Sequence, residues 1–159
     1  MLWHALIVVF LLVVLGGHPA KTKLIHKNDD IRSISSGTSF GECLGYCHRS
    51  IYITNIPPQL ITLKEPNGNQ IKYPTIRRRF RFNSIQWRKL IALVDVRKFR
   101  RLNDRIGCPD CADGGAEWIQ INWSNKSKRV TFEYGKLVNG IEKLINYLRV
   151  LRNQYLKNL

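Results

Sequence analysis

The chain has 159 residues and carries 26 lysines and arginines against 11 aspartates and glutamates, which gives a formal net charge of +15. This length suits one domain with a hydrophobic core, and it excludes a small scaffold that depends on its cysteines alone. The charge excess bears on partners rather than on fold, and it favours polyanions such as sulfated glycans, acidic matrix, anionic membranes or nucleic acid.

Residues 1–20 have the pattern of a signal peptide. The run from Ala5 to Leu15 is entirely apolar, but it is too short for a membrane-spanning helix, which needs about 20 residues. Small and helix-breaking residues follow the run, as expected near a cleavage site. We therefore predict a secreted, extracellular protein, for which nucleic acid is a disfavoured partner. An uncleaved signal anchor is the alternative.

The predicted signal peptide is followed by a flexible polar arm at 21–30 and by a single domain at 31–159. Runs rich in Ile, Tyr and Thr predict strands at 50–54 and 60–63, with a turn at 55–58 between them.

The next segment, Ile76 to Phe82, alternates strictly, which predicts a further strand. One side of this strand carries Arg77, Arg79 and Arg81. The other side carries Ile76, Arg78, Phe80 and Phe82.

Two helices are predicted after this strand. Asn83 or Ser84 is expected to cap the first helix, which runs to about Val94. Its inward side chains are expected to be Ile85, Leu90, Leu93 and Val94. A second, short helix is predicted at 95–102.

The C-terminal part predicts a hairpin and then an amphipathic helix. Residues 117–123 alternate, and residues 129–134 follow after a polar turn. Residues 137–156 have helical spacing, with an apolar stripe of Leu137, Ile141, Leu144, Ile145, Leu148 and Leu151. We expect this helix to pack on a sheet; a helix lying on a membrane is the alternative. The predicted fold is α+β, an antiparallel sheet of five or six strands with two main helices packed on one face and with disulfides that add stability.

Four cysteines stand in two close motifs, Cys43 with Cys47 and Cys108 with Cys111. In an exported protein an even number predicts two disulfides, and three connectivities remain open. A zinc site of four thiolates and a thiol–disulfide oxidoreductase are the alternatives. The residues after Cys111 break a helix rather than open one, which disfavours the oxidoreductase. We predict no metal, no cofactor and no catalytic residue.

Acidic residues are concentrated in one segment of this basic chain, at Asp104, Asp110, Asp113 and Glu117. We expect them to cap turns, with the glycines at 114–115 supplying positive φ before the next strand. A Ca²⁺ site is the alternative, although the spacing does not match an EF-hand loop.

Basic residues form two clusters with a shared basic–aromatic–basic pattern, which is typical of heparin-binding segments. On a strand, alternate arginines stand about 7 Å apart, a spacing that can match successive sulfates or phosphates. The predicted polyanion-binding residues are Arg77, Arg79, Arg81, Arg97, Lys98, Arg100 and Arg101. A solvated charged face is the alternative interpretation.

Two adjacent sequons, at Asn122 and Asn125, predict glycosylation of a secreted chain. They lie so close together that we do not expect both to be occupied.

The cysteines stand in two longer motifs, Phe-Gly-Glu-Cys-Leu-Gly-Tyr-Cys at 40–47 and Gly-Cys-Pro-Asp-Cys-Ala-Asp-Gly-Gly-Ala-Glu-Trp at 107–118. Together these motifs resemble a family of small exported proteins of unknown function. The resemblance spans about residue 31 to the C-terminus and implies export and a compact α+β domain. It implies no activity, and it does not extend to the arginine clusters or the net charge.

The sequence thus predicts a secreted, non-enzymatic basic protein that binds sulfated glycan or acidic matrix, including the matrix of a mineralised tissue. A membrane-active host-defence protein and a thiol-redox or metal-binding protein are the alternatives.

Overall fold

A computed structural model describes residues 30–68 and 71–157. The predicted signal peptide at 1–20 and residues 21–29 of the predicted arm lie outside the described residues. In chain order the elements are β1 (Ile31–Ser39), β2 (His48–Asn55), β3 (Pro58–Glu65), β4 (Ile76–Arg81), α1 (Ser84–Ala92), α2 (Val96–Arg101), β5 (Arg105–Ile106), a 3₁₀ turn (Cys111–Asp113), β6 (Ala116–Trp123), β7 (Ser127–Glu133) and α3 (Glu142–Leu156).

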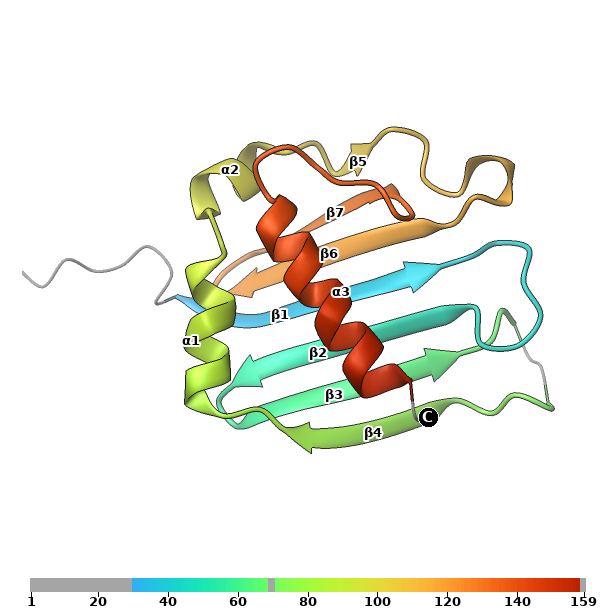
Figure 1. Cartoon of the computed structure of the whole chain (residues 1–159), viewed down its shortest axis with the longest axis horizontal. Coiled ribbons are helices and arrows are strands. Elements are labelled where there is room, and N and C mark those ends of the chain that lie inside the picture. The colour runs from blue at the N-terminus through green and yellow to red at the C-terminus, as the bar shows by residue number, and fades with distance from the viewer. Residues whose placement is uncertain (1–29, 69–70, 158–159) are drawn as a thin grey trace, which may run out of the picture.

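All seven strands belong to one sheet, in the order β4-β3-β2-β1-β6-β7-β5. Every neighbouring pair is antiparallel except β5 and β7, which are parallel. α1 and α3 lie across one face of this sheet, and α2 lies near the edge that β7 and β5 form (Figure 1). The α+β class is confirmed, with two main helices on one face and a short helix between them in the chain. The prediction of an antiparallel sheet of five or six strands matches only in part, because there are seven strands and β5 is parallel to β7. The sheet is mixed and has seven strands with three helices.

The main strand that the sequence did not reveal is β1, at the centre of the sheet. Its sequence, Ile-Arg-Ser-Ile-Ser-Ser-Gly-Thr-Ser, reads as a loop because it is rich in serine and contains a glycine. β1 pairs with β2 on one side and with β6 on the other, so the ladder on both sides satisfies its backbone. Small side chains fit here because side chains of both neighbouring strands reach over β1. At Gly37, for example, the Trp118 ring of β6 leaves no room for a Cβ.

The start of α1 follows from a capping box. The Asn83 side chain accepts hydrogen bonds from the backbone N–H groups of Ile85 and Gln86, and the Gln86 side chain accepts one from the Asn83 N–H. This cap sets the rotation of the helix so that Trp87 and Leu90 are buried. The prediction that Ile85 points inward is wrong, because its side chain is 67% exposed.

α3 begins five residues later than the sequence predicted. Gly140 has a left-handed backbone with φ +87°, and the Glu142 carboxylate accepts a hydrogen bond from its N–H at 2.9 Å, so the helix starts only at Glu142. Leu137 therefore lies outside the helix and is 52% exposed. The rest of the predicted stripe is buried against the sheet, and Leu156 is buried as well although it was not predicted. The buried members of the predicted stripe are Ile141, just before the helix, and Leu144, Ile145, Leu148 and Leu151. Within 30–68 and 71–157 no helix is long and apolar enough to cross a membrane.

The hydrophobic core lies between the helices and one face of the sheet. Strand residues of alternate parity fill it, such as Ile34, Ile51, Leu60, Ile119 and Phe132. The opposite face has no covering helix in the described part of the chain, and it carries arginine, serine and aromatic side chains. The fold therefore places the predicted arginine strand, β4, at an open edge of a partly uncovered sheet.

Candidate polyanion-binding site

The arginines of β4 take the positions that the alternation predicted. Arg77, Arg79 and Arg81 share the face that the helices do not cover, and all three side chains are exposed. β4 is an edge strand, and charge on an edge strand also opposes unwanted pairing with other chains. This row is thus available to a partner.

The second basic cluster lies on α2, at the other side of the sheet. Phe99 is its buried anchor, Asp95 caps the helix, and Arg97, Lys98, Arg100 and Arg101 are exposed. The Arg100 guanidinium lies 4.8 Å from the centre of the Trp123 ring on β6. Five strand spacings separate β4 from β7, which is about 24 Å at about 4.8 Å each. The structure therefore places the predicted binding residues in two separate patches rather than on one surface.

Arg100 is joined by three basic side chains that the sequence analysis did not single out. Lys126, Lys128 and Arg129, from the β6–β7 hairpin, line a hollow of about 540 Å³ together with Arg100. We call this hollow the basic pocket; its other lining residues are Asp104, Trp123, Ser127 and Thr131. Four cations thus face one carboxylate, which leaves a formal surplus of three positive charges (4 − 1).

Aromatic rings hold two of these cations in place. The Arg129 guanidinium lies 4.1 Å from the centre of the Trp118 ring, and its Nε donates to the Gln120 side chain at 3.0 Å. Arg100 lies over Trp123 in the same way. A stacked guanidinium keeps donors free at its edge, so both arginines can still bind a sulfate, phosphate or carboxylate.

The single carboxylate of the basic pocket is weakly engaged. Lys128 Nζ lies 2.7 Å from Asp104 Oδ1, but the Asp104 side chain is 83% exposed. An exposed pair of this kind is worth about 0–1 kcal/mol, so a polyanion can replace Asp104 as the partner of Lys128 at little cost.

The sequence signal for these residues was present but local. Lys126 and Lys128 lie in the polar turn of the predicted hairpin, and Arg129 begins its second predicted strand. Nothing in the sequence places them beside Arg100, which lies more than 20 residues earlier in the chain. Only the pairing of β6 with β7 and the packing of α2 bring the four together.

The two predicted glycosylation sites lie on this same hairpin. Asn122 is a β6 residue whose amide donates to Ser33 Oγ at 2.7 Å and accepts from the Gln120 amide at 2.9 Å. Asn125 lies in the exposed turn next to Lys126. A glycan on Asn125 would stand at the rim of the basic pocket, whereas one on Asn122 would be attached to the amide nitrogen that donates to Ser33 Oγ.

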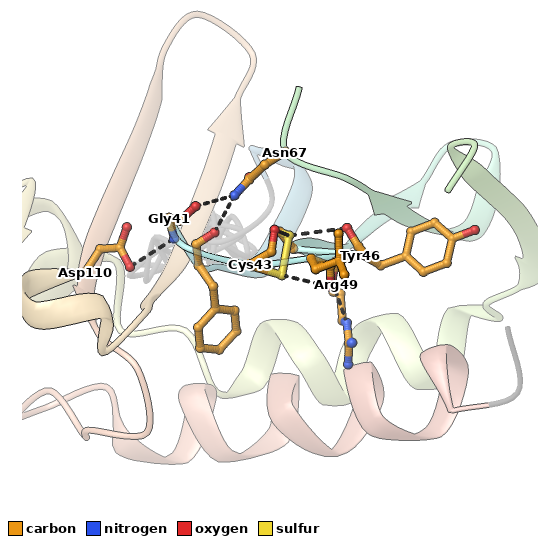
Figure 2. Close-up of a disulfide and its surroundings, with 10 residues drawn as sticks. Gly41, Cys43, Tyr46, Arg49, Asn67 and Asp110 are labelled. Carbon is orange, nitrogen blue, oxygen red and sulfur yellow. Dashed lines mark hydrogen bonds between the residues drawn. A yellow bond between two sulfur atoms is a disulfide. The ribbon is translucent and has the colours of Figure 1, made fainter. Parts of the chain in front are cut away.

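The cysteines pair within each motif. Cys43 is bonded to Cys47 (Figure 2), and Cys108 is bonded to Cys111. The two loops that carry them touch, because the Gly41 N–H donates to Asp110 Oδ1 at 3.3 Å. Of the three connectivities, the structure thus has the one with two local bridges. The chain after Cys111 forms a single 3₁₀ turn with Ala112 at φ 49°, which is not the start of an α-helix.

The acidic segment does not converge on one point. Asp104 pairs with Lys128, Asp110 accepts from the Gly41 backbone, and Glu117 faces the helix-covered side of the sheet, where Arg149 and Arg152 bind it. Across 30–68 and 71–157 no three His, Cys, Asp or Glu side chains are grouped so that they could hold a metal ion. The Ca²⁺ and zinc alternatives therefore gain no support from the geometry.

No protein-family model matches the chain, and comparison with curated proteins finds no relative.

Proposed function

We propose that this is a secreted, non-enzymatic protein that binds extracellular polyanions, such as sulfated glycan or acidic matrix, through the basic pocket and the adjoining α2 cluster. The observation that carries the proposal is the basic pocket itself. Its four cations come from two distant segments, yet they surround one hollow with a single exposed carboxylate. Solubility alone does not require cations to be gathered in this way.

A polymer fits the charge distribution better than a small anion does. Arg97 and Arg101 extend the positive surface of the basic pocket along α2, and the β4 row offers a second patch about 24 Å away. A long chain that reaches both patches gains avidity, because the second contact is made at a high effective concentration.

The test is heparin affinity of a variant in which the four basic-pocket cations, Arg100, Lys126, Lys128 and Arg129, are changed to glutamine. A polyanion held by four such contacts loses on the order of 10²-fold in affinity between 50 and 200 mM salt. We expect the variant to elute from heparin at clearly lower salt and to lose most of this salt dependence.

The matched control changes four exposed cations elsewhere, Lys72, Arg88, Lys89 and Lys143, to glutamine, which removes the same net charge. It should elute close to the wild-type protein. Equal elution of the two variants would show that net charge alone drives retention, and the proposal would fail. Leakage of anionic vesicles by the wild-type protein would favour the membrane-active alternative instead.

The two patches can be separated by the length of the polyanion. An Arg77→Gln, Arg79→Gln, Arg81→Gln variant should bind a short heparin fragment as the wild-type protein does, because such a fragment occupies only the basic pocket. It should bind full-length heparin several-fold more weakly, because the second contact is lost. Titration calorimetry with both ligands measures this; the same loss with both would mean that the β4 row is part of the primary site.

A further inference from the structure

A second hollow, of about 460 Å³, lies at the disulfide end of the sheet, on the side that α3 covers. Arg49 lines it from β2, and Arg152 and Lys157 line it from the end of α3. Phe40 and Tyr134 form one wall. We call it the arginine hollow. It shares no lining residue with the basic pocket.

Arg152 is a buried cation at the base of this hollow, only 6% exposed. One terminal nitrogen donates to the Ser36 hydroxyl and the other to Glu117 Oε1. The guanidinium has five N–H donors, and these two bonds are the ones it makes among the described residues. A buried guanidinium is costly unless its charge is balanced, so the balance around Arg152 decides what the hollow can hold.

The positive charge of Arg152 is only partly balanced, because the Glu117 carboxylate also binds Arg149. Arg149 Nε lies 3.1 Å from both oxygens of the Glu117 carboxylate, and Arg149 Nη2 lies 2.7 Å from one of them. Two guanidiniums thus divide one carboxylate that is itself 1% exposed. The cluster carries a formal surplus of one positive charge, and Arg152 is its member that lines the hollow.

Further positive charge stands at the mouth. Arg49 is held by a hydrogen bond from its Nε to the Tyr46 carbonyl at 3.1 Å, and it points from the disulfide loop toward α3 (Figure 2). Arg49 also lies directly opposite Lys64 in the β2–β3 register. Burial lowers the pKa of Lys64, and the charge of Arg49 lowers it further. Lys157 is exposed on the other side, and no carboxylate lines the hollow.

The side chains that line the arginine hollow suit a ligand with a flat, weakly polar ring. The rings of Phe40 and Tyr134 pack edge to face, with centres 5.0 Å apart, and Leu156 adds an apolar surface. Thr38 and Asn153 supply a hydroxyl and an amide. Apolar walls with a few converging polar groups are typical of small-molecule sites, and the volume lies in their usual range of about 300–1,000 Å³.

We propose that the arginine hollow binds a small carboxylate whose body is a single ring, aromatic or sugar. The carboxylate would accept hydrogen bonds from Arg152 and from Arg49 or Lys157, and the ring would lie against Phe40 and Tyr134. A carboxylate suits this position because a guanidinium donates to both of its oxygens, and because its charge offsets the surplus left by Glu117.

The experiment is a solution NMR titration of the full chain with benzoate and with glucuronate, at constant ionic strength maintained by chloride. We expect saturable shifts of the Phe40 and Tyr134 resonances with a dissociation constant on the order of 1 mM, as for a small ligand with few contacts. The better binder of the two identifies the ring class. No saturable shift with either ligand would overturn the proposal, and inorganic phosphate binding equally tightly would overturn the assignment to carboxylates.

Two variants spare the buried cluster, so that the fold is preserved. Arg49→Gln with Lys157→Gln should weaken binding at least tenfold, whereas the control Arg88→Gln with Lys143→Gln should leave it unchanged. Asn153→Trp should fill the mouth and block binding without removing charge. Equal affinity of the Arg49→Gln, Lys157→Gln variant and its control would count against the site. The four-residue basic-pocket variant should bind both carboxylates normally, so failure of one proposal does not imply failure of the other.

Discussion

A Glu117→Ala substitution should lower the free energy of unfolding by about 3–5 kcal/mol, the range seen when one partner of a buried ion pair is removed. Glu117 accepts hydrogen bonds from both Arg149 and Arg152, and Arg152 is buried on the face of α3 that packs on the sheet. Without the carboxylate, the Arg152 guanidinium retains only the Ser36 hydroxyl as an acceptor among the described residues. The interface between α3 and the sheet would then contain an uncompensated positive charge, that of Arg152.

Chemical denaturation followed by circular dichroism measures this effect. Asp104→Asn is the matched control, because it also removes one carboxylate from an ion pair, but from an exposed one that is worth about 0–1 kcal/mol. Glu117→Leu combined with Arg152→Met should recover much of the stability, because apolar side chains of similar size often replace a buried pair without loss. A cost for Glu117→Ala no larger than for the control would show that the cluster is hydrated rather than buried.

Gly115→Ala should also be strongly destabilising, by about 2–5 kcal/mol. Gly115 has φ +78°, a conformation that costs a residue with a Cβ about 1–2 kcal/mol. A Cβ at this position would stand 2.3 Å from Cε1 of Phe40, and overpacking of this kind costs about 1–3 kcal/mol more. The Gly115 carbonyl also accepts from the N–H groups of Asp110 and Tyr134, so the backbone has little freedom to move away.

Gly135 provides the control for the backbone part of this cost. It has the same φ of +78°, but a Cβ there would meet nothing within 4 Å. Gly135→Ala should therefore cost only about 1–2 kcal/mol, and the difference between the two variants measures the contact with Phe40. Phe40→Leu should recover part of the loss in Gly115→Ala. Equal melting temperatures for the two alanine variants would mean that Phe40 moves aside freely.

The two cysteine motifs, at 40–47 and 107–118, meet in the structure. Asp110 holds Gly41, Gly115 lies against the ring of Phe40, and Glu117 binds the arginines of α3. Each of these contacts joins the sheet end to a loop or helix, and in the described residues none places a nucleophile beside a base. These contacts therefore hold this end of the domain together, and two of the residues in them, Phe40 and Arg152, line the wall and base of the arginine hollow.

Local patterns in the sequence were enough to predict most elements. Alternation placed Arg77, Arg79 and Arg81 on one face, because side chains on a strand point to opposite sides in turn. The cap at Asn83 was predictable because its side chain accepts from the next turn of the chain. The helix stripe from Leu144 to Leu151 followed from the helical period in the same way.

Features that depend on distant residues came only from the tertiary structure. β1 is a strand because β2 and β6 pair with it on both sides, although its serines favour a loop. The basic pocket exists because α2 packs beside the β6–β7 hairpin, and Glu117 is buried because α3 brings two arginines over it. Strand alternation and helix capping act over a few residues and can be read from the chain, whereas charge balance and burial depend on which segments the fold brings together.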